Sequence, residues 1–365
     1  MNLLLTPAIH VMERLRFSYK FGLIFTVIML PIFILSWLFI SSINEKVALL
    51  ESEIVGVEYI KAARLPLEHI QQHRGMMSTY HNGVKELRDR ILEKRKHIDS
   101  YLSELEAIDQ KLGKPLKTEG LVNSIKSNWN TIKTNSFDLN SNIALENHNA
   151  LLLELISLMQ HVAHTSKLSL DPVLDSRYLG FSLVSDLPDL TESMGKTRVL
   201  AAGIAAAGRF TPSNFTQLSV LENKMQVSNK NMKNGVQSAM DFNPALAGRL
   251  QDKLGASNEA IAAMYVMITE DMLDSEKINV DSDTVSTVSS KAISQAYALF
   301  DVILPELVEL FEQRIVDETI AKYTALSVVI LVLALIVYLF FGFYASIKEN
   351  ISLVGQSIQE IADGK

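Results

Sequence analysis

Two arginines are the residues of this sequence best suited to binding a small anion. Arg74 is followed by the residues GMM and Arg198 by VLAA, so each guanidinium stands among small or apolar neighbours. A planar guanidinium offers a fork of N–H donors that fits a nitrate or a carboxylate. We therefore predict that Arg74 and Arg198 bind ligand, together with His73 and Met77 beside Arg74.

The alternative is that these arginines are structural and pair with a carboxylate such as Glu68 or Glu192. A weak internal echo favours a shared role, because RLPLEHIQQHR and DLPDLTESMGKTR both place Leu-Pro ahead of the arginine, with Pro-to-Arg steps of 8 and 10. If the two halves repeat, the two arginines would face one cavity.

The spacing of two groups of histidines permits a metal site. His69 and His73 are four residues apart with His81 beyond them, and His161 and His164 are three apart. The sequence has no His-Glu-x-x-His motif, which is typical of catalytic zinc sites, and no cysteine, which is a common zinc ligand. We predict hydrogen-bonded or exposed histidines, with neither a metal nor a cofactor.

Sequence motifs of enzymes are incomplete. The GKT at 195–197 lacks the upstream glycine of a phosphate-binding loop, and GFSLV at 180–184 lacks the closing glycine of a nucleophile elbow. The carboxylates are scattered along helices. We predict no catalytic residues and no enzymatic activity.

Composition narrows the class of protein further. The chain has 365 residues, of which 48% are hydrophobic, a net charge of -7 and no cysteine. Zero cysteines exclude disulfide scaffolds and thiolate chemistry, and the mild acidity gives no reason to expect nucleic acid as a partner. The sites above must therefore be held in place by helix packing alone.

Two long runs without a charged residue, at 21–43 and 323–347, are long enough to cross a membrane as helices. A cleaved signal peptide for the first run and a buried core helix for the second are the weaker alternatives. Basic residues precede the first run, which predicts that residues 1–20 are cytoplasmic. Residues 44–322 would then lie outside the cytoplasm, and 348–365 inside it.

The region between the runs has the apolar spacing of helices throughout. Pro, Gly and Asp signals predict breaks at Gly83, at 113–115, 171–172, 211–213 and 243–244, and around 274–283. We count eight helices in this region, of which the first continues from the first run and the eighth enters the second. The fold class that follows is an all-α membrane protein, with two transmembrane helices flanking two four-helix bundles.

After the second run, apolar residues recur at steps of 4, 3, 4 and 3. This heptad spacing is typical of a helix that pairs in a parallel coiled coil, and it predicts a homodimer. The alternative is an amphipathic helix on the lipid surface, although the basic residues that such a surface favours are scarce here. The seam consists of Ile347, Ile351, Val354, Ile358 and Ile361.

The segment SIKENISLVGQSIQEIADGK resembles the first helix of a HAMP signal-relay module, with Ile361-Ala362-Asp363-Gly364 at the matching positions. Asn350 stands where that family usually has proline. The chain ends at Lys365, before the HAMP connector and second helix would follow.

The outer region resembles the periplasmic input region of bacterial methyl-accepting chemotaxis proteins. The phrases that carry this resemblance are LRFSYKF, IQQHRGMMS, HNALLLELISLMQHVAHTSKLSLDP, YLGFSLVSDLPDLTESMGKTR and AISQAYALFDVILPELVELFEQR. The HRG element and tandem bundles are similar to nitrate-sensing NIT domains, and helical bimodular domains, which sense organic acids, share the architecture.

The resemblance implies a receptor of the bacterial inner membrane, with a large periplasmic domain. Its partners would be lipid, a second copy, and a small solute or a solute-binding protein. It would reach the cytoplasmic chemotaxis kinase complex only through a part beyond Lys365. The same architecture serves as the input half of sensor histidine kinases and diguanylate cyclases, and a structural membrane protein without a ligand is a third reading.

Overall fold

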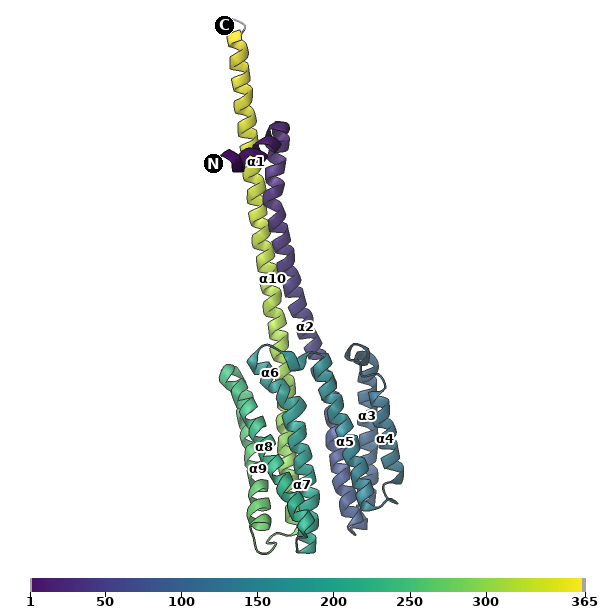
Figure 1. Cartoon of the computed structure of the whole chain (residues 1–365). Helices are drawn as coiled ribbons and strands as arrows, with labels where there is room; N and C mark the ends of the chain where they lie inside the picture. The colour runs from purple at the N-terminus through teal and green to yellow at the C-terminus, as the bar shows by residue number, and fades with distance from the viewer. Residues whose placement is uncertain (1, 363–365) are drawn as a thin grey trace. The chain divides into compact units, whose positions relative to one another are not determined.

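The computed structural model describes residues 2–362, and every regular element in that range is helical. The prediction of an all-α fold is therefore confirmed. Figure 1 shows the chain as a set of long helices joined by short turns. The α-helices are α1 (Asn2–Arg14), α2 (Phe17–His81), α3 (Arg88–Leu116), α4 (Leu121–Asn135), α5 (Ser141–Thr165), α6 (Leu174–Phe181), α7 (Leu187–Ala207), α8 (Pro212–Phe242), α9 (Ala247–Ile268) and α10 (Ser282–Ala362).

Five short helical segments complete the regular structure of residues 2–362. Three are single 3₁₀ turns, η1 (Lys85–Leu87), η2 (Leu168–Leu170) and η4 (Pro244–Leu246). Two are π-helical, η3 (Ser182–Asp186) and η5 (Thr269–Leu273). Because η3 joins α6 to α7 without a turn, residues 174–207 form one continuous helix with a widened π segment inside it.

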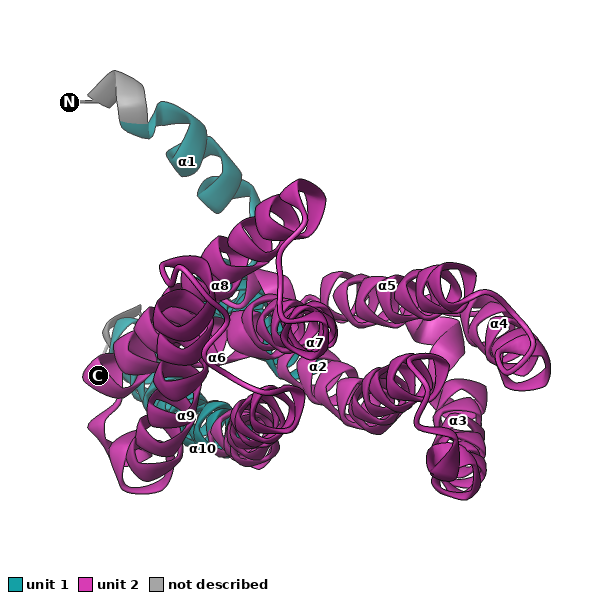
Figure 2. Cartoon of the chain, turned by 90° about the horizontal axis from the view of Figure 1, so that it is seen from below, with its two compact units in different colours: residues 1–48, 314–365 teal, residues 49–313 magenta. Residues whose placement is uncertain are grey.

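The chain divides into two compact units, one of residues 1–48 and 314–365 and the other of residues 49–313 (Figure 2). In the first unit, parts of α2 and α10 contact each other. Phe21 packs its ring against Phe340 at 6.0 Å between centroids, and Lys46 forms an ion pair with Glu318 at 3.0 Å. The separate helix α1 was not anticipated by the sequence, which indicated only a cytoplasmic segment there.

Both α2 and α10 are long and apolar enough to cross a membrane. They carry the uncharged runs 21–43 and 323–347. The most apolar stretch of α10 has no buried residue, so this part of α10 does not lie in a core of the described chain.

The second unit contains the remaining helices. Helices α3, α4 and α5 pack on one another, as do α6, α7, α8 and α9 in a second group. The parts of α2 and α10 inside this unit supply further contacts. His73 of α2 contacts α3 and α5, while Arg198 of α7 and Arg249 of α9 bond to α10.

The apolar spacing of α10 explains why its N-terminal half lies in a core. Apolar residues of this half recur at steps of three and four residues and form one face of the helix, and six of them have no exposed surface. A stripe at steps of three and four residues is buried on one side because the helix turns every 3.6 residues. The six are Val285, Ala292, Ala296, Leu299, Ile303 and Leu307.

Most of the predicted breaks coincide with helix ends, but one was misplaced and one was missed. Helix α3 continues through Pro115 to Leu116 and ends at Lys117, which adopts a left-handed conformation with φ of 56°. Pro115 lacks an N–H and its ring crowds the carbonyl four residues back, which weakens the last turn, and the helix stops within two residues of it. The missed break, at 136–140 before α5, has no proline or glycine; Asn140 caps α5 by accepting from the Asn142 N–H.

Candidate functional site

A polar cavity of about 410 Å³ lies inside the unit of residues 49–313. Four helices and one 3₁₀ turn contribute to its wall, so residues distant in sequence meet there. The lining consists of Gln72, Gly75, Met76 and Thr79 from α2, Leu87 from η1, Arg90, Glu93, Lys94 and His97 from α3, Arg198 from α7, and Ser286 and Ser290 from α10.

The charge of this wall is opposite to that of the chain. Three cations, Arg90, Lys94 and Arg198, face one carboxylate, Glu93, which leaves +2 when His97 is counted as neutral. The whole chain carries -7. Serine, threonine and glutamine side chains add hydrogen-bond donors. The cavity is therefore suited to an anion with several acceptor oxygens.

Arg198 is held in the cavity wall by one hydrogen bond and by close packing. Its Nη1 donates to Ser290 Oγ at 3.1 Å. Its Nη2 lies only 2.3 Å from where a Cβ would stand on Gly75, so the guanidinium rests directly on the α2 backbone. Burial, and then the neighbouring charge of Arg74, lower the pKa of Arg198 to about 10, so it stays protonated at neutral pH.

Lys94 is held by neutral acceptors. Its Nζ donates to Gln72 Oε1 at 2.7 Å and to His69 Nδ1 at 3.2 Å. Burial, and then the charge of Lys94, lower the pKa of His69 to about 4, which keeps that ring neutral and able to accept. Burial also lowers the pKa of Lys94 itself. An anion in the cavity would supply Lys94 with a counter-charge at hydrogen-bond range.

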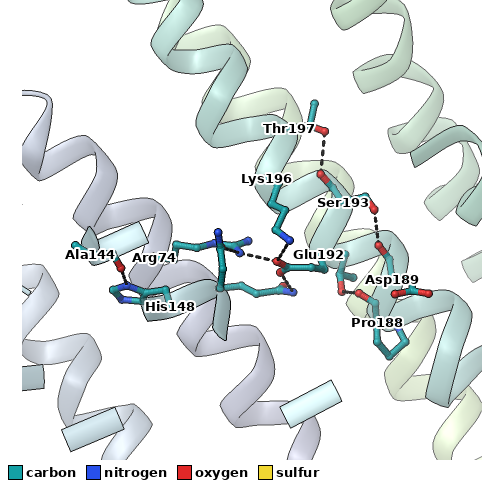
Figure 3. A network of polar contacts seen from close by, with 12 residues as sticks. Arg74, Ala144, His148, Pro188, Asp189, Glu192, Ser193, Lys196 and Thr197 are labelled. Atoms are coloured by element: carbon teal, nitrogen blue, oxygen red, sulfur yellow. Dashed lines mark hydrogen bonds and ion pairs between the residues drawn. The ribbon is translucent and has the colours of Figure 1, made fainter. Parts of the chain in front are cut away.

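Arg74 does not line the cavity, although it lies close to Arg198. It is 1% exposed, and its Nη1 donates to Glu192 Oε1 and to Asn149 Oδ1, both at 2.7 Å. Glu192 also accepts from Gln71 and pairs with Lys196 (Figure 3). The structural alternative thus describes Arg74, with Glu192 as its partner; Glu68 pairs with Arg64 instead.

The two predicted arginines meet where α2 crosses α7, in a reciprocal arrangement. Arg198 packs on Gly75 of α2, and the Nη2 of Arg74 lies 2.7 Å from the place of a Cβ on Gly195 of α7. Each guanidinium occupies space that the other helix leaves by having a glycine. The structure brings the pair together but turns only Arg198 to the cavity.

His73 and Met77, the other predicted ligand residues, are buried away from the cavity. The sulfur of Met77 accepts from Ser136 Oγ at 3.8 Å. His73 accepts from Arg95 Nε at 3.2 Å, so its other ring nitrogen carries the proton and donates to His148 Nε2 at 2.8 Å. His148 in turn donates from Nδ1 to the carbonyl of Ala144 at 2.6 Å.

This chain of donors and acceptors is complete only when both rings are neutral. Burial is the main cause that lowers the pKa of His148 to about 4 and the pKa of His73 well below its usual value. The ring of Trp129 from α4 makes a T-shaped contact with the His73 ring, with 5.1 Å between the centroids. In the part of the chain that the structure describes, no group of three or more His, Asp or Glu residues could hold a metal ion.

Arg90 and Lys94 were missed by the sequence analysis, although a signal for them exists. The residues Arg90, Glu93, Lys94 and His97 follow steps of three, one and three, so they share one face of α3. Charged helix faces are usually solvated, and nothing in the sequence says that α7 and α10 stand opposite this one.

The predicted coiled-coil seam forms a row along the end of α10. Ile351, Val354 and Ile358 are 54%, 59% and 62% exposed in the single chain, and Ile347 is partly exposed. The side chain of Ile361 and residues 363–364 lie outside the described residues. These exposed isoleucine and valine side chains form an apolar surface that a partner helix or lipid could cover.

In comparisons with known proteins, no protein-family model, no curated protein and no solved structure matches this chain. The site itself therefore carries the functional argument.

Proposed function

We propose that the chain is the sensory part of a transmembrane signal transducer of the chemoreceptor type. In this proposal the runs 21–43 and 323–347 cross the inner membrane, and the periplasmic region between them forms two four-helix bundles of eight helices. That region binds a small anion, an organic acid rather than nitrate, and passes a conformational shift along the second span to the HAMP helix of a dimer.

The observation that carries the proposal is the cavity lined by Arg90, Lys94 and Arg198, called the cation-rich cavity below, together with the contribution of α10 to its wall. Ser286 and Ser290 line the cavity, and the same helix continues to Ala362 through the uncharged run. An anion that draws Arg198 towards Arg90 and Lys94 would compete with its bond to Ser290. Binding would then favour one position of α10 over another, which is the requirement for a ligand to shift a conformational equilibrium.

Size and charge favour an organic acid with two or three carboxylates. A volume of about 410 Å³ falls within the range of small-molecule pockets, roughly 300–1,000 Å³, and far exceeds the space one nitrate needs. Three cations around it can each bond to a carboxylate oxygen, since charge-assisted hydrogen bonds are stronger than neutral ones.

Calorimetry on the full chain in lipid nanodiscs tests this proposal, with succinate, citrate and nitrate as ligands. We expect a dicarboxylate or tricarboxylate to bind and R90Q or R198Q to weaken it about tenfold, because each substitution removes one charge-assisted bond. R209Q is the matched control, since Arg209 is exposed and does not line the cavity. Absence of binding to all three anions, or an equal loss in R209Q, would contradict the proposal.

A second function has the same input and a different output. The chain would then be the input half of a sensor histidine kinase or a diguanylate cyclase, which use the same arrangement of spans, sensor region and HAMP. In both cases the cation-rich cavity would bind the same class of ligand. The full reading frame of the gene that encodes this sequence distinguishes them.

A further inference from the structure

A second cavity, of about 460 Å³, lies where α5 gives way to α6. It shares no residue with the cation-rich cavity. Its wall combines two aromatic rings and a valine with one cation and no carboxylate. The lining residues are Gln160, Ser169, Arg177, Tyr178, Phe181, Val184 and Ser185.

The aromatic wall is unusually open for side chains of this kind. Tyr178 and Phe181 are 38% and 55% exposed, while Leu179 and Leu183 on the opposite face are fully buried. Leu174, one turn before Tyr178 in α6, and Leu170 of η2 are also exposed. An exposed apolar patch of this kind on a folded protein commonly marks a binding surface.

Arg177 supplies the only charge in the wall. Among the described residues, no ion pair or hydrogen bond is recorded for its guanidinium, and it is exposed. An arginine without a counter-ion beside two aromatic rings can bond a carboxylate through its fork while a ring of the ligand packs on Tyr178 and Phe181.

Two of the seven lining residues belong to a π segment. Val184 and Ser185 belong to η3, in which the Leu187 N–H bonds to the carbonyl of Ser182, five residues back. Such widened turns are rare and occur frequently at functional sites, because the inserted residue redirects the side chains around it. Here the redirected residues are part of the cavity.

We propose that this cavity is a second ligand site and takes a small aromatic monocarboxylate. The carboxylate bonds to Arg177 and the ring lies between Tyr178 and Phe181, with Ser169, Ser185 and Gln160 at the polar edge. One cation selects a single negative charge, whereas the cation-rich cavity selects two or more. The site is independent of the proposed membrane relay and of the anion bound by Arg198.

Ligand-observed NMR and calorimetry on the full chain in nanodiscs test the proposal with phenylacetate as the probe. Phenylacetamide, which has the ring without the charge, and acetate, which has the charge without the ring, are the comparison ligands. We expect phenylacetate to bind saturably and the other two to bind about tenfold more weakly. R177Q should reduce phenylacetate binding to the level of the amide, and F181A should weaken it without lowering the unfolding temperature, since Phe181 is exposed.

R90Q is the matched control, because it removes an exposed arginine from the other cavity. It should leave phenylacetate binding unchanged, so a failure of the organic-acid site and a failure of this one are told apart. Lack of saturable phenylacetate binding, equal binding of the amide, or an equal loss in R90Q and R177Q would overturn the proposal.

Discussion

Arg74 and Arg198 have the same side chain and similar sequence surroundings, yet only one of them is available to a ligand. Arg74 is neutralised by Glu192, whereas Arg198, among the described residues, donates only to the hydroxyl of Ser290. A buried guanidinium needs a counter-charge to offset its loss of hydration. Arg74 has that charge within the protein, whereas Arg198 forms no ion pair among the described residues and would gain a counter-charge from a bound anion.

Gly75 should control the position of Arg198. In G75A the added Cβ would stand 2.3 Å from Arg198 Nη2, and a flexible side chain moves more readily than a helix backbone. We expect weaker binding of organic acids to the cation-rich cavity, measured by calorimetry, with little loss of folding stability. G203A is the control, because its Cβ meets nothing within 4 Å; it should leave binding unchanged and stabilise α7 by up to about 1 kcal/mol.

The buried histidine pair should make the protein sensitive to acid. His148 is neutral in the folded state, with its pKa lowered from 6.5 to about 4, whereas the unfolded chain takes up a proton below pH 6.5. Stability is therefore complete above that pH and falls as the pH drops towards 4, by about 3 kcal/mol for this residue.

Denaturant unfolding of the full chain in detergent at a series of pH values measures this loss. H148Q should be less stable than the wild type at pH 7.5 but should lose less stability on acidification. His164 is exposed, so H164Q should behave like the wild type. Parallel pH profiles for wild type and H148Q would show that another group is responsible.

At the scale of elements, the site depends on faces of helices rather than on single positions. The cations of α3 lie on one face of that helix. In α10 one face is buried in the core, and the adjacent face carries Ser286 and Ser290. Both faces are readable as periodic patterns, but a pattern does not name its partner. That Arg90 and Lys94 are opposite Arg198 depends on which helices become neighbours.

The ion pair between Arg74 and Glu192 should join α2 to α7. R74M leaves Glu192 buried with fewer partners, and we expect a loss of about 3 kcal/mol in unfolding free energy. R74M/E192M should cost less than the sum of the two single changes, because no buried charge is left unpaired and Lys196, the other partner of Glu192, is partly exposed to water. K126M breaks the half-exposed pair with Glu106 and should cost less than about 1 kcal/mol. Additive effects in the double variant would show that the two side chains are not coupled.

At the scale of the whole molecule, cysteine labelling can test the proposed membrane topology. Because the chain has no cysteine of its own, a single introduced cysteine is the only site that a maleimide can label. Ser103 and Lys348 are both exposed in the structure. We expect S103C to react with a membrane-impermeant maleimide on intact cells, and K348C to react only after the inner membrane is opened, because the basic residues before the first run hold the N-terminus inside. Labelling of K348C on intact cells would contradict this orientation.

The sequence by itself determined the all-α class, the two long uncharged runs, most helix ends and the core face of α10. These follow from local causes: helix periodicity, proline and glycine chemistry, and the absence of charge over a stretch long enough to cross a bilayer. The end of α3 beyond Pro115 and the break before Asn140 were missed because capping by a single residue is a weak signal.

Only the tertiary structure decided which of the predicted residues share a cavity. Residues 72, 94, 198 and 290 come from four helices, and their meeting depends on the packing of α2, α3, α7 and α10. The same packing buried Arg74, His73 and Met77 against partners more than 50 residues away in the chain. Charge and residue type are properties of the sequence, but whether a charge is already neutralised is a property of its neighbours in space.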